Sequence, residues 1–215
     1  QVILEPDAGI LSKLTAPQEK STDTSEGTHT ADGTHVSIYS ADDPCAPLPE
    51  YADGIAVFGC PLLSDETKQY EYYRAIAERT PDCRAIIRMP VISPKDPDRQ
   101  IKYDQQIRAV FRAASHGEPG ILFPMITSVK EVERIKEICE EVKAELRSDG
   151  IEYSDKIELG IMIETPAAAL ISDRLAPMVD FFSVGTNDLT QYTLACDRQN
   201  PDIEEFIDTH HEAIL

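Results

Sequence analysis

Short apolar runs alternate with amphipathic helical segments along most of this 215-residue chain, and this alternation constrains the fold more than any other feature. We predict six strands, at residues 36–39, 54–59, 85–92, 120–125, 158–163 and 181–184. Three clear helices are predicted between them, from Ser64 to about Arg79, from about Ile101 to Ala114, and from Ser128 to about Arg147. Repeated strand and helix indicate a parallel sheet covered by helices.

Two α/β architectures satisfy this pattern, an open doubly wound sheet and a closed (β/α)8 barrel. No G-x-G-x-x-G turn follows an early strand, and polar residues of functional type follow several different strands. Both observations favour the barrel. Because a full barrel of eight strands typically needs about 250 residues, the expected fold is an incomplete TIM-type (β/α)8 barrel with six recognisable strands.

The domain organisation is predicted from a change in composition near Thr34. Residues 19–33 are rich in Ser, Thr, Asp and Gly, which is typical of a linker. We therefore expect residues 1–33 to be a linker or the remnant of a preceding domain, and residues 34–215 to form the partial barrel. Because the chain begins at Gln1, we also expect it to be a fragment or a processed product.

Charge and cysteine usage exclude several classes of function. The 39 acidic and 20 basic residues give a net charge of −19, which argues against nucleic acid and anionic membranes as partners. The five cysteines are odd in number and contain no C-x-x-C pair, so neither a disulfide framework nor a zinc site is expected. No apolar run approaches the ~20 residues that span a bilayer. A cytoplasmic protein is predicted.

Two apolar runs end abruptly at a carboxylate. The run before Glu164 reads L-G-I-M-I, and the run F-F-S-V-G-T-N leads to Asp188. If the two strands are neighbours in a parallel sheet, both carboxylates leave it at the same edge, and adjacent strands lie about 4.8 Å apart. Two such oxygen ligands suit a hard divalent cation, Mg²⁺ or Mn²⁺. The alternatives are a charged strand terminus at Glu164 and a helix cap at Asp188.

Three further polar residues are candidates for ligand binding. Asn187 can offer its amide to a phosphate or carboxylate oxygen, or cap the following helix. Arg88 lies within a predicted strand, where a guanidinium needs either an internal carboxylate or a ligand anion. Arg198 is preceded by Asp197, so a surface ion pair is its simplest interpretation.

Three segments of the second half resemble a known family. They are I-L-F-P-M-I at 121–126, L-G-I-M-I-E-T-P-A-A-A at 159–169 and F-F-S-V-G-T-N-D-L-T-Q-Y-T-L-A-C-D-R at 181–198. Together they resemble the C-terminal barrel of the phosphoenolpyruvate-protein phosphotransferases, Enzyme I of the sugar phosphotransferase system, within the wider phosphoenolpyruvate-utilising superfamily. The first half resembles the family only through V-I-L-E-P and A-D-G-I-A-V-F.

The resemblance implies roles for the candidate residues. Glu164 and Asp188 would bind Mg²⁺. Asn187 would contact phosphoenolpyruvate, and Arg88 and Arg198 would hold its phosphate and carboxylate groups. The family also implies a homodimer, an acceptor histidine on a separate phosphohistidine domain, and an HPr-like carrier as a partner. No catalytic residue is assigned within this chain.

Several family motifs have no counterpart in this sequence. Residues 59–62 read G-C-P-L where the family has R-T-E-F, and the G-G-D-K, G-W-R and G-M-C-G-E segments are not found. Whether the chain is itself an enzyme therefore stays open. Two alternatives are kept: a non-catalytic paralogue that serves dimerisation or regulation, and a metal-dependent lyase acting on a pyruvate-like substrate.

Overall fold

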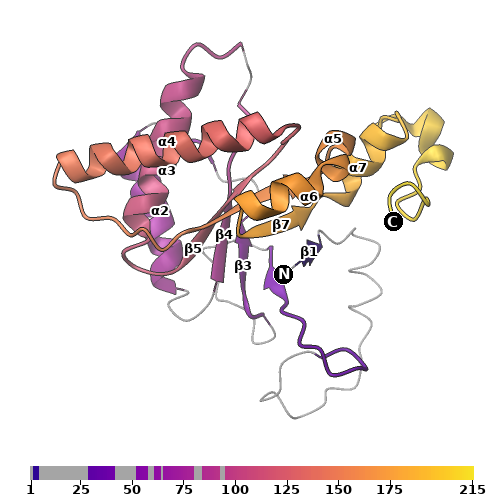
Figure 1. The fold of residues 1–215 in the computed structure, drawn as a ribbon, viewed down its shortest axis with the longest axis horizontal. Coiled ribbons are helices and arrows are strands. Elements are labelled where there is room, and N and C mark those ends of the chain that lie inside the picture. The colour runs from indigo at the N-terminus through magenta and orange to yellow at the C-terminus, as the bar shows by residue number, and fades with distance from the viewer. Residues whose placement is uncertain are drawn as a thin grey trace. The chain divides into compact units, whose positions relative to one another are not determined.

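The protein is described by a computed structural model that covers residues 2–4, 29–41, 52–57, 61–63, 65–79, 84–92 and 95–215. These residues form two compact units. The first unit contains Val2–Leu4, Leu122–Glu137 and Glu158–Leu215, and the second contains the described residues from 29 to 121 together with Ile138–Ile157. Helices and parallel strands build both units (Figure 1), so the predicted α/β class is confirmed.

The second unit contains three short strands that pair in parallel. They are β2 (Tyr39–Ser40), β3 (Gly54–Val57) and β4 (Arg84–Arg88), with β3 between the other two. Gly54 stands opposite both Tyr39 and Arg84. A Cβ atom at position 54 would lie 2.3 Å from the Arg84 carbonyl oxygen and 2.6 Å from a Tyr39 ring carbon, so only glycine fits there.

The first unit contains a second parallel group of strands, β1 (Val2–Leu4), β6 (Glu158–Ile163) and β7 (Phe181–Val184). β7 lies between the other two, since Phe182 stands opposite Val2 on one side and Ile161 on the other. β5 (Pro119–Phe123) contributes residues to both units, and all five of its residues are buried. Such continuous burial is typical of parallel strands covered on both faces.

The strand order is β1-β7-β6-β5-β4-β3-β2. From β2 to β7, each strand therefore lies beside its neighbour in sequence, as in a (β/α)8 barrel. Seven described strands do not complete such a barrel, and the expected incomplete TIM-type barrel is confirmed. β1 is the exception to the sequential order, because the first strand of the chain pairs with the last.

The helices of the second unit begin and end close to their predicted positions. α2 (Glu66–Arg79) and α3 (Arg99–Ala113) pack against each other. Asp65 Oδ1 accepts a hydrogen bond of 2.9 Å from the Lys68 N–H, which caps the first turn of α2. Ser64, the predicted cap, lies outside the described residues.

α4 (Val129–Ser148) confirms the helix predicted from Ser128 to about Arg147. The Glu131 N–H donates to Ser128 Oγ at 3.4 Å, and the Ser128 N–H donates to Glu131 Oε2 at 2.9 Å. This reciprocal pair is a capping box, which fixes where the helix starts. The remaining helical elements of the first unit are α5 (Pro166–Leu170), α6 (Ser172–Leu175), η1 (Ala176–Met178), α7 (Thr186–Thr193) and η2 (Pro201–Phe206).

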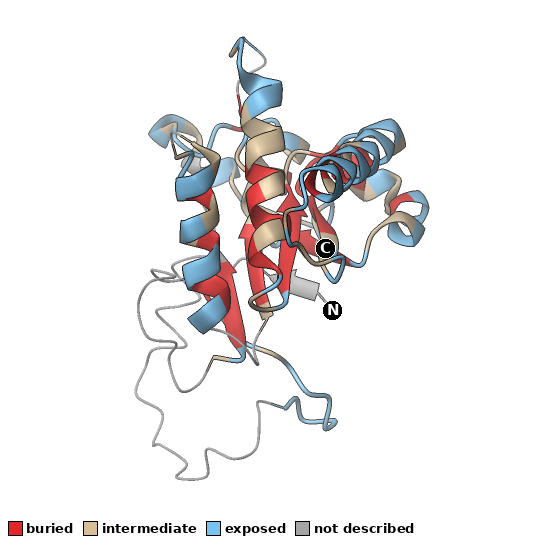
Figure 2. Ribbon diagram, turned by 90° about the vertical axis from the view of Figure 1, so that its left-hand side faces the viewer, coloured by how far each residue is buried: buried red, intermediate tan, exposed pale blue. Residues whose placement is uncertain are grey.

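Buried residues concentrate on the strands and on one face of each long helix (Figure 2). In the second unit, Ile86, Ile87 and Tyr73 are at most 1% exposed, and in the first unit Ile161, Met162 and Leu175 are fully buried. In the first unit, Gly160 faces Phe181, where a Cβ atom would lie 2.3 Å from the ring. None of the helices in the described parts of the chain is both long and apolar enough to cross a membrane.

The strand predictions differ from the structure mainly at the ends of elements. The predicted strand 85–92 stops at Arg88, because Pro90 carries no N–H for a ladder hydrogen bond. The predicted strand 36–39 contributes only Tyr39 to β2. The predicted strand 54–59 is seen as far as Val57, and its last two positions lie outside the described residues, as do Cys45, Cys60, Cys83 and most of the predicted linker. The boundary predicted near Thr34 stays a prediction.

Candidate functional site at the carboxyl ends of β6 and β7

The carboxyl ends of β6 and β7 lie side by side in the first unit. The two strands are parallel neighbours whose last residues, Ile163 and Val184, stand opposite each other. Past these ends, the Gly185 N–H still donates a hydrogen bond of 3.1 Å to the Ile163 carbonyl oxygen. Glu164 therefore leaves the sheet at the edge where the β7–α7 connection begins, which is the arrangement expected from the two interrupted apolar runs.

Glu164 is fully buried, at 0% exposure, directly after β6. Its Oε1 atom accepts a hydrogen bond of 2.6 Å from the backbone N–H of Met125, in the connection after β5. Met125 adopts a φ of 58°, a left-handed conformation that is uncommon for a residue with a side chain. Backbone strain of this kind concentrates at functional sites, where the surroundings hold it in place.

Thr165 holds the same connection through its side chain. Its Oγ1–H donates to the Ile126 carbonyl oxygen at 2.7 Å, and Oγ1 accepts the Ala168 N–H at 3.1 Å. The second bond makes Thr165 the N-cap of α5, with Pro166 at the first helical position. Two hydrogen bonds therefore join the connections after β5 and after β6. The Met125 N–H donates to Glu164, and the Thr165 hydroxyl donates in the opposite direction to the Ile126 carbonyl oxygen.

Gly185 approaches Glu164 from β7. A Cβ atom at position 185 would lie 2.8 Å from Glu164 Cβ and 3.1 Å from Glu164 Oε2. Any larger residue would force Glu164 to shift, because real Cβ atoms essentially never approach another atom as closely as 2.8 Å. The glycine thus lets the backbone after β7 pack directly against the Glu164 carboxylate, whose Oε2 atom is buried.

Asn187 and Asp188 lie in the first turn of α7. The N-cap of α7 is Gly185, and no side chain forms a cap hydrogen bond there, so neither residue serves as the helix cap. Asp188 Oδ1 lies 3.4 Å from Arg198 Nη2, with the two side chains 28% and 43% exposed. The Arg198 N–H is also fixed, since it donates to Gln191 Oε1 at 3.1 Å. The structure therefore brings Asp188 and Arg198 together at the surface.

Arg88 belongs to the second unit, whereas the other four candidates belong to the first. It is the last residue of β4 and is half-buried. Arg88 is predicted from the sequence to lie within a strand, whereas in the structure it ends one.

The donor chemistry of the first unit fits a hard divalent cation. Glu164 and Asp188 supply two carboxylates, and carboxylate oxygens are the protein ligands that Mg²⁺ and Mn²⁺ prefer. Across the residues that the structure describes, no cluster of three or more His, Cys, Asp or Glu side chains is placed to hold a metal ion. Mg²⁺ commonly uses only one or two carboxylates, with water and substrate oxygens completing its octahedron. The two carboxylates of Glu164 and Asp188 are consistent with that mode.

Two residues of this site were not among the candidates predicted from the sequence. Met125 contributes through its backbone, and nothing in its residue type indicates a left-handed conformation. Thr165 did carry a signal, because Thr followed by Pro at a strand end is typical of a helix N-terminus.

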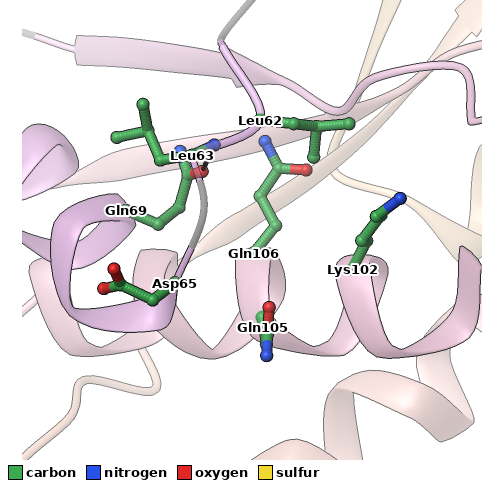
Figure 3. Close-up of a pocket in the computed structure, with 7 residues that line it drawn as sticks. All are labelled: Leu62, Leu63, Asp65, Gln69, Lys102, Gln105 and Gln106. Carbon is green, nitrogen blue, oxygen red and sulfur yellow. Dashed lines mark hydrogen bonds between the residues drawn. The ribbon is translucent and has the colours of Figure 1, made fainter. Parts of the chain in front are cut away.

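A separate pocket lies in the second unit, between α2, α3 and residues 61–63 (Figure 3). Two buried glutamines line it. Gln69 Oε1 accepts the Leu63 N–H at 3.0 Å, and Gln106 Nε2 donates to the Tyr73 hydroxyl at 2.5 Å. The charged residues at the rim already form ion pairs, Asp65 with Lys68 and Lys102 with Asp96. The pocket therefore lacks the convergent unpaired charge that an anionic substrate requires.

Comparison with known proteins identifies relatives of this chain. A family model described as PEP-utilising enzyme, PEP-binding domain, matches residues 83–215. The phosphoenolpyruvate-protein phosphotransferase of Streptococcus equinus is 39% identical over 175 residues, which cover 70% of this chain and 30% of the relative. The protein of the same name from Haemophilus influenzae is 48% identical over 118 residues, which cover 55% of this chain and 20% of the relative. The one from Buchnera aphidicola is 36% identical over 188 residues, which cover 77% of this chain and 33% of the relative. The chain thus spans about a third or less of the length of these relatives.

Proposed function

This chain belongs to the family of PEP-utilising enzymes through their PEP-binding domain, and on that premise we propose that the edge formed by β6 and β7 binds phosphoenolpyruvate together with Mg²⁺. Glu164 and Asp188 are the proposed ligands of the cation. When bound, the cation would neutralise negative charge on the phosphoryl and enolate oxygens of the substrate. The parallel pairing of β6 and β7, which puts both carboxylates after neighbouring strand ends, is the observation that carries this proposal.

The proposed substrate contacts come from Asn187, Arg198 and Arg88. The Asn187 amide is a neutral donor suited to a phosphate or carboxylate oxygen. Arg198 is more than a third exposed and faces Asp188, so it can pair with a substrate anion without first leaving a buried site. Arginine binds phosphate and carboxylate in a bidentate manner, which orients the substrate as well as holding it. Arg88 is assigned to the same substrate as a phosphate ligand.

The relatives suggest the wider reaction. Since they are phosphoenolpyruvate-protein phosphotransferases, we propose that this chain supplies phosphoenolpyruvate for transfer of its phosphoryl group to a histidine on a separate domain. An HPr-like carrier would receive the group next, and the protein would act in the cytoplasm as a homodimer. In this scheme the chain binds and orients the substrate, while the acceptor lies elsewhere.

Mn²⁺ titration followed by electron paramagnetic resonance tests the cation site. We expect the wild-type chain to bind Mn²⁺, to release it to Mg²⁺, and to bind phosphoenolpyruvate more tightly when the cation is present. Glu164→Gln keeps an oxygen for the Met125 N–H but removes the negative charge, so its Mn²⁺ affinity should fall by about 10- to 100-fold. Calorimetry with phosphoenolpyruvate gives an independent measure of the affinity for the substrate.

Glu158→Gln is the matched control, because Glu158 lies at the opposite end of the same strand and is exposed. Its Mn²⁺ and phosphoenolpyruvate affinities should equal those of the wild type. A wild-type chain that binds neither Mn²⁺ nor phosphoenolpyruvate at millimolar concentration would overturn the proposal. The family motifs missing from the sequence would then favour the non-catalytic module.

A further inference from the structure

Two glutamines that line the pocket of the second unit each carry a buried atom with no hydrogen-bond partner among the described residues. The atoms are Gln69 Nε2, on α2, and Gln106 Oε1, on α3. The two residues are only 3% and 1% exposed. Buried polar atoms are nearly always hydrogen-bonded, either to protein groups or to ordered water. Both atoms therefore point to a partner other than the protein groups around them.

The other end of each amide is held by the protein. Gln69 Oε1 accepts the Leu63 N–H at 3.0 Å, and Gln106 Nε2 donates to the Tyr73 hydroxyl at 2.5 Å. Turning over the Gln69 amide would set its NH₂ group against the Leu63 N–H, so that two donors would face each other. Both side chains reach from their helices toward residues 62 and 63 (Figure 3). Gln69 thus offers a spare donor and Gln106 a spare acceptor.

The pocket that the two glutamines line has room for one water molecule. The space in it that the centre of a water-sized molecule can occupy is about 10 Å³. A polar site needs about 10–15 Å³ by this measure to hold a water molecule. Leu62 also lines the pocket and is 44% exposed, so the pocket borders solvent, from which water can enter.

The ligand of such a site must accept one hydrogen bond and donate another. A metal ion or an ammonium ion cannot accept a bond from Gln69, and a halide ion cannot donate one to Gln106. The charged residues at the rim of the pocket already form ion pairs, so they call for no charged ligand. Water meets both requirements and has the size that the space allows.

We propose that the pocket is a binding site for one ordered water molecule, which accepts a hydrogen bond from Gln69 Nε2–H and donates one to Gln106 Oε1. This water joins α2 to α3, and the bond from Leu63 to Gln69 extends the link to the connection that follows β3. Waters bonded in this way to buried polar groups are part of the structure and are costly to remove. The site contains none of the residues assigned to Mg²⁺ or phosphoenolpyruvate, so it does not depend on the proposed function.

Nuclear magnetic resonance of the ¹⁵N-labelled chain tests this proposal through cross peaks with water. In the wild type, the side-chain amide protons of Gln69 should show a cross peak at the water frequency. Its laboratory-frame and rotating-frame Overhauser effects should have opposite signs, which distinguishes a bound water from proton exchange. Gln106→Met removes the acceptor but leaves the observed protons of Gln69 in place, so the cross peak should be lost. Methionine is unbranched like glutamine, and its thioether is only a weak acceptor.

Gln105→Met is the matched control, because Gln105 precedes Gln106 on α3 and lines the same pocket. Gln105 is half-buried, and its amide is not among the buried groups that lack a partner. This variant should keep the cross peak of the wild type. Loss of the cross peak in Gln106→Met but not in Gln105→Met supports the bridging water.

Two results would overturn the proposal. The first is a wild-type chain without the cross peak, and this result is decisive whether or not Gln106→Met folds. The second is a folded Gln106→Met chain in which the cross peak persists at wild-type intensity, since the water would then not depend on Gln106.

Discussion

Burial sets the chemistry of Cys139, a free thiol on α4 that is 6% exposed. Desolvation disfavours the thiolate and raises the pKa of Cys139 from 9.0 to about 12, although the nearby Lys143 opposes this shift. Since the thiolate is the reactive form, Cys139 is inert near neutral pH. A structural role follows, in keeping with a chain whose cysteines form no recognisable metal or redox motif.

The raised pKa predicts how Cys139 affects stability at alkaline pH. The folded state keeps its proton up to about pH 12, whereas the unfolded chain loses it near pH 9.0. The contribution of Cys139 is therefore constant below about pH 9 and declines as the pH rises from there toward 12. Urea unfolding of the wild type and of Cys139→Ala from pH 7 to pH 10.5 checks this.

The difference in unfolding free energy between the two proteins should shrink only above pH 9. Thiol alkylation of the native chain at pH 8, followed by peptide mapping, should leave Cys139 unmodified until denaturant is added. Rapid native labelling at this position would contradict the raised pKa.

At the scale of whole elements, Arg108 connects three segments of the second unit. Its side chain on α3 contacts Glu66 at the start of α2 at 3.0 Å, Glu145 on α4 at 3.6 Å and Asp149 just after α4 at 2.5 Å. Arg112 adds a 2.5 Å contact to the other oxygen of Glu66. Arg108 is only 13% exposed and Glu66 is 25% exposed, so solvent screens this pair less than it screens surface pairs.

Arg108→Met should therefore lower the free energy of unfolding by about 1 kcal/mol, because it takes one of two arginine partners from the partly buried Glu66 and the shared cation from the exposed Glu145 and Asp149. Arg74→Met is the matched control. Arg74 forms a single pair with Glu78 one turn away on α2, at 2.7 Å, and both side chains are 47% exposed. The control should cost at most about 0.5 kcal/mol. Equal losses in urea unfolding would show that burial of Arg108 adds nothing.

The elements predicted correctly from the sequence are those whose ends are determined by nearby residue types. β6 and β7 have the predicted bounds, because each is a continuous apolar run that ends at a turn or a carboxylate. α4 starts as predicted because Ser128 and Glu131 form a local capping box. β4 was predicted too long, since hydrophobicity continues past Arg88 while hydrogen bonding does not.

What the sequence did not predict depends on contacts distant along the chain. The pairing of Val2–Leu4 with β7 joins opposite ends of the sequence, and no local pattern specifies the partner of a three-residue strand. In the candidate site, Glu164 was predictable because it interrupts an apolar run. Its hydrogen bond to Met125 was not, because that bond depends on backbone conformation rather than on residue type.

At the scale of the whole molecule, the net charge of −19 creates a field that attracts cations. Such a field raises the concentration of divalent ions near the surface, and added salt screens it. The screening length falls from about 10 Å at 0.1 M to about 3 Å at 1 M ionic strength. The proposed cation site should therefore be sensitive to salt even though Glu164 itself is buried.

A surface potential of about one kT per unit charge contributes about two kT to the binding of a divalent ion. Screening this potential should therefore weaken Mn²⁺ binding by about seven-fold. We expect this loss of affinity between 0.05 M and 1 M NaCl, measured by electron paramagnetic resonance at constant pH. Mn²⁺ titration of a neutral small-molecule chelator through the same salt series corrects for ion activity. An affinity that does not change with salt would show that the surface charge does not reach the site.

The discontinuity of the two units has a consequence for synthesis on the ribosome. The last segment of the second unit ends at Ile157, whereas the first unit needs β6, β7 and α7, which are translated afterwards. Since domains generally fold as units while translation proceeds, the second unit is complete before β7 has left the ribosome. β1 reaches its partner only after residues 181–184 of β7 have been translated. Glu164 and Asp188 consequently reach their native surroundings only after the second unit has been translated.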